Sequence, residues 1–109
     1  ALRLWLAENG YEIQRETLVQ DGSFLYTVLT ARWDGGERTL SPGEQFVSPQ
    51  LRAENSPLLD VYIQRVENAL RATVEGLHGA EHPRPERLAY HEAALREIEE
   101  MREHDAEGQ

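Results

Sequence analysis

The hydrophobic pattern of the first residues indicates a short helix. Leu2, Trp5 and Leu6 follow one another at i, i+3 and i+4, and Gly10 stands just beyond them. This spacing predicts an amphipathic helix over residues 1–9 with a glycine at its carboxyl end. Ser, Thr, Asp and Asn are the residues that usually cap the first turn of a helix, and none of them precedes it. We therefore expect the chain to begin in the middle of a fold.

Two strands follow, at residues 11–20 and 23–33, and the dipeptide Asp21-Gly22 between them is typical of a β-hairpin turn. The second strand is apolar on both faces, with Phe24, Tyr26 and Val28 on one and Leu25, Leu29, Ala31 and Trp33 on the other. Such a strand belongs in a sheet that is covered on both sides. We expect part of the fold to lie outside this chain; alternatively, the C-terminal helices fold back and cover one face.

The middle of the chain reads as a connector. Asp34-Gly35-Gly36 predicts a turn, and Ser41-Pro42-Gly43-Glu44 fits a capping box followed by one or two helical turns. The segment FVSPQL at 46–51 predicts an apolar connector that is interrupted by Ser48-Pro49. Ser56-Pro57 then predicts the start of a long helix, because it combines a capping residue with proline in the first turn.

The C-terminal half carries two helical seams with alternating spacings of three and four residues. The seam of the long helix consists of Leu59, Ile63, Val66, Leu70, Thr73 and Leu77. After a helix-breaking stretch at 78–84, Pro85 starts a second helix whose seam is Leu88, His91, Leu95, Ile98 and either Met101 or Arg102. The pair predicts an antiparallel helical hairpin with coiled-coil packing over 57–104. It is preceded by a unit at 1–40 and a connector at 41–56, and followed by a frayed tail at 105–109.

Composition narrows the possible functions. The 109 residues carry a net charge of −9 from 20 acidic residues and 11 basic ones, all of them arginine. There is no cysteine, which excludes disulfides, thiolate metal sites and a cysteine nucleophile. The apolar stretches are too short to span a membrane. The acidic balance argues against a free-standing nucleic-acid-binding protein. Residues 85–109 hold eight of the acidic residues and only three arginines, whereas residues 57–84, which include the long helix, hold four acidic residues and three arginines and are close to neutral.

No residue pattern in the chain predicts a catalytic, cofactor-binding or metal site. His78 and His82 have ligand-like spacing, but the glycine and proline around them oppose a rigid site. The glutamates of the last helix read as a solvated face rather than as acid–base catalysts. Asp34-Gly35-Gly36 follows a strand but is not followed by the helix that a cofactor loop needs.

Four arginines are the candidates for contact with an RNA backbone: Arg65, Arg71, Arg84 and Arg87. The first two lie on the long helix and the others at the predicted tip of the hairpin. The alternative is that they pair with glutamates on the same helices, such as Glu67, Glu75 and Glu86.

The order of these segments resembles the C-terminal portion of the bacterial tRNA (adenine(22)-N(1))-methyltransferase family, whose members depend on S-adenosylmethionine. The similarity rests on the order and spacing of Leu2-Arg3-Leu4-Trp5-Leu6, Asn9-Gly10-Tyr11, Phe24-Leu25-Tyr26 and Phe46-Val47-Ser48-Pro49-Gln50-Leu51. It covers nearly the whole chain, but only the second half of a family member.

The resemblance implies that the chain is an α+β fragment: the last helix and final β-hairpin of a Rossmann-like class I methyltransferase sheet, followed by the helical hairpin. It also implies a cytoplasmic enzyme that methylates N1 of an adenine in tRNA, with the cofactor and catalytic residues upstream. The fragment would be inactive, supporting the sheet of the upstream domain and helping to hold tRNA, and it could self-associate. The alternative is a non-enzymatic coiled-coil module that binds a partner protein.

Overall fold

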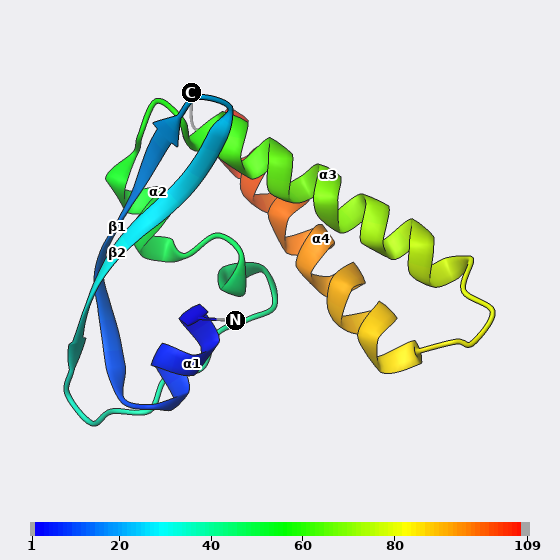
Figure 1. Cartoon of the computed structure of the whole chain (residues 1–109), viewed down its shortest axis with the longest axis horizontal. Helices are drawn as coiled ribbons and strands as arrows, with labels where there is room; N and C mark the ends of the chain where they lie inside the picture. Colours follow the sequence, from blue (N-terminus) through cyan, green and yellow to red (C-terminus); the bar gives the residue numbers. More distant parts are fainter. Residues whose placement is uncertain (1, 108–109) are drawn as a thin grey trace.

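The computed structural model describes residues 2–107 and has an α+β architecture. A helix and a β-hairpin form one side, a pair of long helices forms the other, and a connector lies between them (Figure 1). The elements in chain order are α1 (Leu2–Glu8), β1 (Tyr11–Asp21), β2 (Phe24–Trp33), the 3₁₀ turn η1 (Gly43–Gln45), α2 (Pro49–Glu54), α3 (Leu59–His78) and α4 (Pro85–Glu107).

The predicted β-hairpin is confirmed. β1 and β2 pair antiparallel, and Asp21 faces Phe24 across the turn, where Gly22 adopts a positive φ of 60°. The pairing shifts by one residue between Ile13 and Arg15, which marks a β-bulge. Because of the bulge, Ile13 and Glu16 are both buried although they are three positions apart. The buried face beyond the bulge therefore consists of Glu16 and Leu18, which the sequence did not predict.

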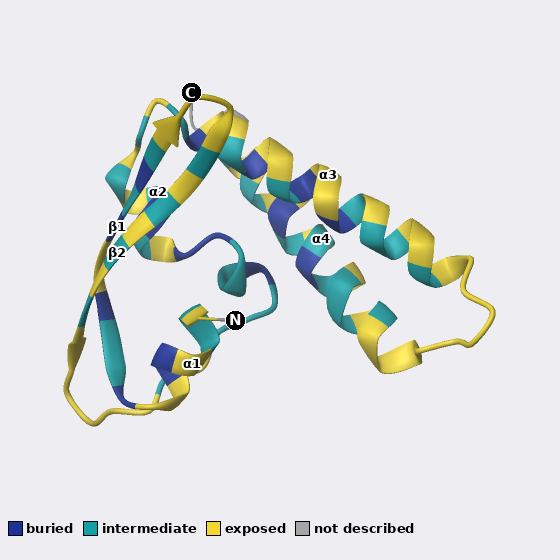
Figure 2. Cartoon of the chain, viewed as in Figure 1, coloured by how far each residue is buried: buried dark blue, intermediate teal, exposed yellow. Residues whose placement is uncertain are grey.

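The two apolar faces of β2 differ in exposure (Figure 2). Leu25 packs against the core, and Leu29 lies opposite Phe46 and Tyr90 across a hollow of about 290 Å³. The other face carries Phe24, Tyr26 and Val28, which are all exposed, Phe24 to 74%. Helices and the connector thus cover one face of the strand as far as Ala31, whereas Trp33 at its end is 65% exposed and the second apolar face remains open.

The connector is more structured than the sequence predicts. The predicted capping box is present, since Glu44 accepts a hydrogen bond from the Ser41 amide (2.9 Å) and donates its own amide to the Ser41 hydroxyl. Only the short turn η1 follows it. The sequence did not predict the short helix within the connector, where Ser48 caps the amide of Leu51 (3.0 Å) and Pro49 opens α2.

The two C-terminal helices are antiparallel. Arg102 near the end of α4 pairs with Glu67 in the middle of α3, and His78 at the end of α3 lies 4.0 Å from Glu92 of α4. α3 begins at Leu59, two residues after the expected proline, and α4 begins at Pro85 as predicted. α4 continues three residues past the expected end at residue 104, and Gly108 and Gln109 lie outside the described residues. The coiled-coil packing of this pair stays a prediction.

One hydrophobic core joins the sheet to the helical hairpin. Its buried residues come from β1, the connector, α2 and both long helices: Leu18, Val47, Leu51, Leu59, Ile63, Leu70, Ala94 and Ile98. Three of the predicted seam residues of α3 and one of α4 are among them. Ala94 was not predicted, because a small residue gives a weak hydrophobic signal. No helix of the described part of the chain is long and apolar enough to cross a membrane.

Candidate nucleic-acid interface

The four candidate arginines differ in whether they form ion pairs in the structure. Arg71 on α3 donates to the Glu67 carboxylate at 2.7 Å, as the pairing alternative expects. Arg102 from α4 binds the other oxygen of the same carboxylate. These hydrogen bonds, that of Arg102 first, hold the pKa of Glu67 below its usual range although burial opposes them. Arg71 therefore pairs within α3, and Arg102 links the same carboxylate to α4.

The other three candidates are not neutralised by carboxylates. Arg65 on α3 donates to the backbone carbonyl of Ser23 in the β-hairpin turn (3.2 Å). Arg84 and Arg87 are exposed at the tip of the helical hairpin. None of the three belongs to an ion pair within the described part of the chain. The alternative of pairing with neighbouring glutamates therefore describes Arg71 alone.

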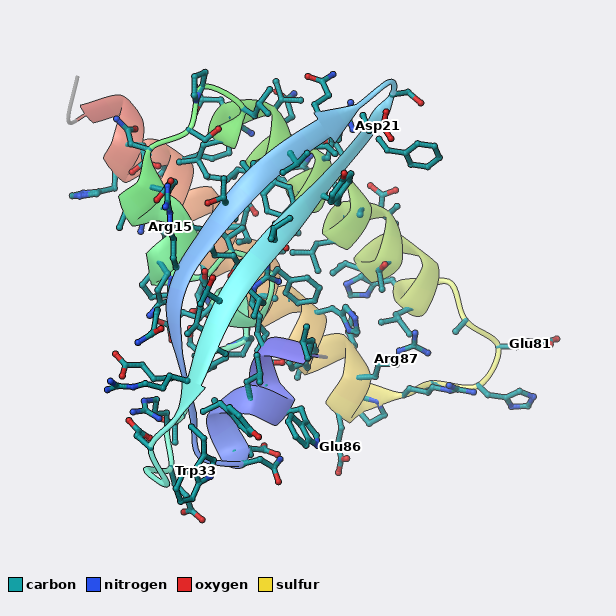
Figure 3. The ribbon with its side chains drawn as sticks, turned by 60° about the vertical axis from the view of Figure 1, so that its left-hand side comes forward. Arg15, Asp21, Trp33, Glu81, Glu86 and Arg87 are labelled. Atoms are coloured by element: carbon teal, nitrogen blue, oxygen red, sulfur yellow. The ribbon has the colours of Figure 1, made fainter. Side chains whose placement is uncertain are left out.

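The tip is open to solvent throughout, since every residue from 78 to 87 is exposed. Glu86 and Arg87 point to different sides of the start of α4, and Glu81 lies in the loop beyond it (Figure 3). Arg87 has its backbone carbonyl within 2.8 Å of the His91 Nδ1. The guanidinium groups of Arg84 and Arg87 are thus free to meet an anionic partner that approaches the tip.

The Asp34-Gly35-Gly36 segment is a turn closed by its own side chains. Asp34 is tied to Arg38 and to the amide of Gly36 (2.9 Å), which lowers the pKa of its carboxyl to about 2. The segment after it continues without a helix, so no helix N-terminus is presented to a phosphate or a carboxylate. Among residues 2–105, no three histidine or acidic side chains cluster in a way that could hold a metal ion.

A buried polar network connects the two sides of the molecule. Glu16 on β1 is completely buried and receives both Nε and Nη2 of Arg3 from α1, with Nε 3.1 Å from each carboxylate oxygen. The Ser48 hydroxyl donates to the same carboxylate at 2.7 Å. Burial alone would raise the pKa of Glu16, but these hydrogen bonds outweigh it and hold the pKa below its usual range.

The Arg3 guanidinium also reaches the connector and α3. Its Nη1 donates to the Gln45 carbonyl at 3.0 Å, and its Nη2 donates to the Tyr62 hydroxyl at 3.3 Å. Tyr62 in turn donates to the Phe46 carbonyl (3.0 Å). The sequence did not reveal this network, because the bulge in β1 hides that Glu16 faces inward. The predicted apolar stripe of α1 gave no signal either, because Leu2 and Trp5 are exposed and the helix buries Leu6 and Ala7 instead.

We compared the chain with known proteins and solved structures. A search of the curated proteins finds no match. The fold is similar to that of a solved, uncharacterized protein from Listeria monocytogenes serotype 4b, with 18% sequence identity and a TM-score of 0.65. The similarity covers 91% of this chain and 44% of the Listeria chain, so the present chain spans less than half of that protein.

The matching family is a class of RNA-modifying enzymes. Residues 1–102 match the model of TrmK, tRNA (adenine(22)-N(1))-methyltransferase. The chain belongs to this family.

Proposed function

We propose that the chain is the C-terminal part of an S-adenosylmethionine-dependent enzyme that methylates N1 of an adenine in tRNA. In this proposal α1, β1 and β2 form the edge of the methyltransferase sheet, and α3 with α4 helps to hold the tRNA. The observation that carries the proposal is the contrast between the two sides of this molecule. The sheet side leaves an apolar face of β2 open, and the tip of the helical hairpin carries arginines without ion pairs among the described residues. The cytoplasm is the expected location for this reaction.

The open face of β2 supports the first half of the proposal. Phe24, Tyr26 and Val28 form three exposed apolar positions in a row along one strand, and the outer edge of β2 has no strand beside it in the described residues. An unpaired strand edge with an apolar face is a surface that proteins usually cover. The remainder of a Rossmann-like sheet would supply both the missing strand and the missing cover. In the isolated chain the same surface favours self-association.

The cofactor belongs to the rest of the enzyme in this proposal. The described residues offer neither a glycine-rich loop that leads into a helix nor a free acidic group beside one, so they do not fit S-adenosylmethionine. We expect the 109-residue chain alone to bind no S-adenosylmethionine in a calorimetric titration. Measurable binding would contradict this division of roles.

Salt-dependent tRNA binding by the intact enzyme tests the role of the tip. Arg84→Ala with Arg87→Ala should weaken binding, and it should lower the slope of log affinity against log salt by about 2, since each phosphate contact adds about one unit. Arg96→Ala is the matched control, because Arg96 is exposed on α4 and forms no ion pair among the described residues. Equal behaviour of the double variant and the control would overturn the RNA role of the tip. It would favour the alternative of a protein-interaction module.

A further inference from the structure

The direction in which the helical hairpin leaves the sheet must be fixed if its tip is to hold a substrate. The shared core holds the two sides together through apolar side chains such as Leu18, Leu51 and Ile63. Burial of apolar surface is not directional, so it sets closeness better than it sets an angle. Hydrogen bonds to a planar guanidinium do constrain direction.

We propose that Arg3 is a positioning residue that fixes the orientation of the α3–α4 hairpin relative to the sheet. One guanidinium binds three elements at once: the Glu16 carboxylate on β1, the Gln45 carbonyl of η1 and the Tyr62 hydroxyl on α3. Arg3 itself lies on α1, and 14% of its side chain is exposed. The network therefore joins α1 and β1 to the connector and to α3, the first helix of the hairpin.

The turn η1 of the connector, which Arg3 binds, is also hydrogen-bonded to α4. The Gly43 amide donates to Glu97 at 3.1 Å, and the Tyr90 hydroxyl donates to the Gln45 side chain. A Cβ on Gly43 would come within 2.6 Å of the Glu97 Cβ, so η1 and α4 touch with no room to spare. Arg3 and α4 thus both bind the same short turn. α3 is therefore linked to Arg3 directly, and α4 is linked to it through η1.

The energetics of buried ion pairs agree with an orienting role. Desolvation of the two charges cancels much of their attraction, so a buried pair of this kind adds little net stability compared with an apolar pair. Its geometric demands remain, and in some proteins buried polar groups specify one arrangement among several. The Arg3–Glu16 pair has such a defined geometry, because the Glu16 carboxylate also accepts a hydrogen bond from the Ser48 hydroxyl, which caps α2.

Distances between two spin labels measure the orientation directly. The chain has no cysteine, so cysteines introduced at Thr30 on β2 and Glu75 on α3, both exposed, carry the only labels. We expect one narrow distance distribution for this doubly labelled chain, and a shifted or broadened one after Tyr62→Phe or Arg3→Lys. Lysine keeps the charge but not the planar fork. Tyr62→Phe removes one hydroxyl and keeps the ring, so it decides the question if Arg3→Lys fails to fold.

Tyr11→Phe is the matched control. Tyr11 stacks on Trp5 at the far end of β1, with ring centroids 5.8 Å apart, and its hydroxyl makes no hydrogen bond within the described part of the chain. The control should leave the distance distribution unchanged. If Tyr62→Phe and Arg3→Lys also leave it unchanged, Arg3 does not set the orientation.

The consequence for tRNA rests on the proposed function and has its own readout. In the intact enzyme, Tyr62→Phe should raise the KM for tRNA about fivefold, the size expected for one lost hydrogen bond, and leave the KM for S-adenosylmethionine unchanged. Equal increases in both constants would indicate a general structural defect and overturn the positioning role. A changed label distance with an unchanged KM for tRNA would instead contradict the tRNA role of the hairpin.

Discussion

Replacement of Glu16 by glutamine tests whether the buried network contributes to folding as its geometry indicates. The substitution keeps the size of the side chain and removes its charge. The new amide nitrogen would face donors from Arg3 or Ser48, because the native carboxylate accepts hydrogen bonds from both residues. Arg3 would then be left buried beside a neutral group. Breaking one partner of a buried pair in this way costs about 3–5 kcal/mol.

That cost is large for a chain of this size. The free energy of unfolding of a small domain is about 5–15 kcal/mol. With a urea slope of about 1.5 kcal/mol per molar, Glu16→Gln should lower the midpoint of urea unfolding by 2–3 M. Circular dichroism at the helical minimum follows the transition, because α3 and α4 dominate the signal.

Glu54→Gln is the control for this measurement. Glu54 pairs with Arg15 at 2.6 Å, but the Arg15 side chain is 67% exposed, so the loss of this pair costs less than about 1 kcal/mol. Both variants remove one carboxylate charge that is paired with an arginine of the sheet side. Similar midpoints for Glu16→Gln and Glu54→Gln would refute the reasoning about burial.

Three further predictions concern the same fold. The pKa values of Glu16 and Glu67 lie below the ordinary value of 4.5. The two carboxylates therefore stabilise the fold fully above pH 4.5, and this stabilisation is lost as the pH falls through their lowered pKa values. The midpoint of urea unfolding should fall over the same pH range, and it should fall less steeply for Glu16→Gln. Gly43→Ala should destabilise the fold by about 1–3 kcal/mol, because the added Cβ would clash with Glu97 of α4. Gly76→Ala in the interior of α3 should stabilise the fold by about 0.5–1 kcal/mol, because its Cβ would have no neighbour within 4 Å. Thermal unfolding distinguishes a lowered from a raised melting temperature. Ile98→Ala should cost about 2–5 kcal/mol in urea unfolding, since Ile98 is completely buried, and a loss under 1 kcal/mol would contradict the described core.

The local elements could be predicted from the sequence because short-range signals determine them. The Asp21-Gly22 turn, the capping box at Ser41 and the start of α4 at Pro85 each depend on residues within one or two turns. The seam of α3 was predicted for a similar reason, since a regular spacing of leucine and isoleucine marks the side of a helix that faces a partner.

The junction could not be predicted in the same way. A bulge near Ile13 shifts which residues of β1 face inward, and no local signal in the strand marks its place. Glu16, Gln45 and Tyr62 meet around Arg3 only because the tertiary packing brings them there from separate elements. The pairing of Arg71 with Glu67 was among the alternatives, but the contribution of Arg102 from the facing helix was not.

The role of the chain in tRNA methylation can be tested by primer extension on tRNA treated with the intact enzyme and S-adenosylmethionine. A methyl group on N1 of adenine blocks base pairing, so reverse transcription stops beside the modified nucleotide. We expect a stop at adenine 22 with the native enzyme, little change with Arg96→Ala, and a strongly reduced stop when Arg84 and Arg87 are both replaced by alanine. No stop with the native enzyme, or an undiminished stop with the double variant, would contradict it.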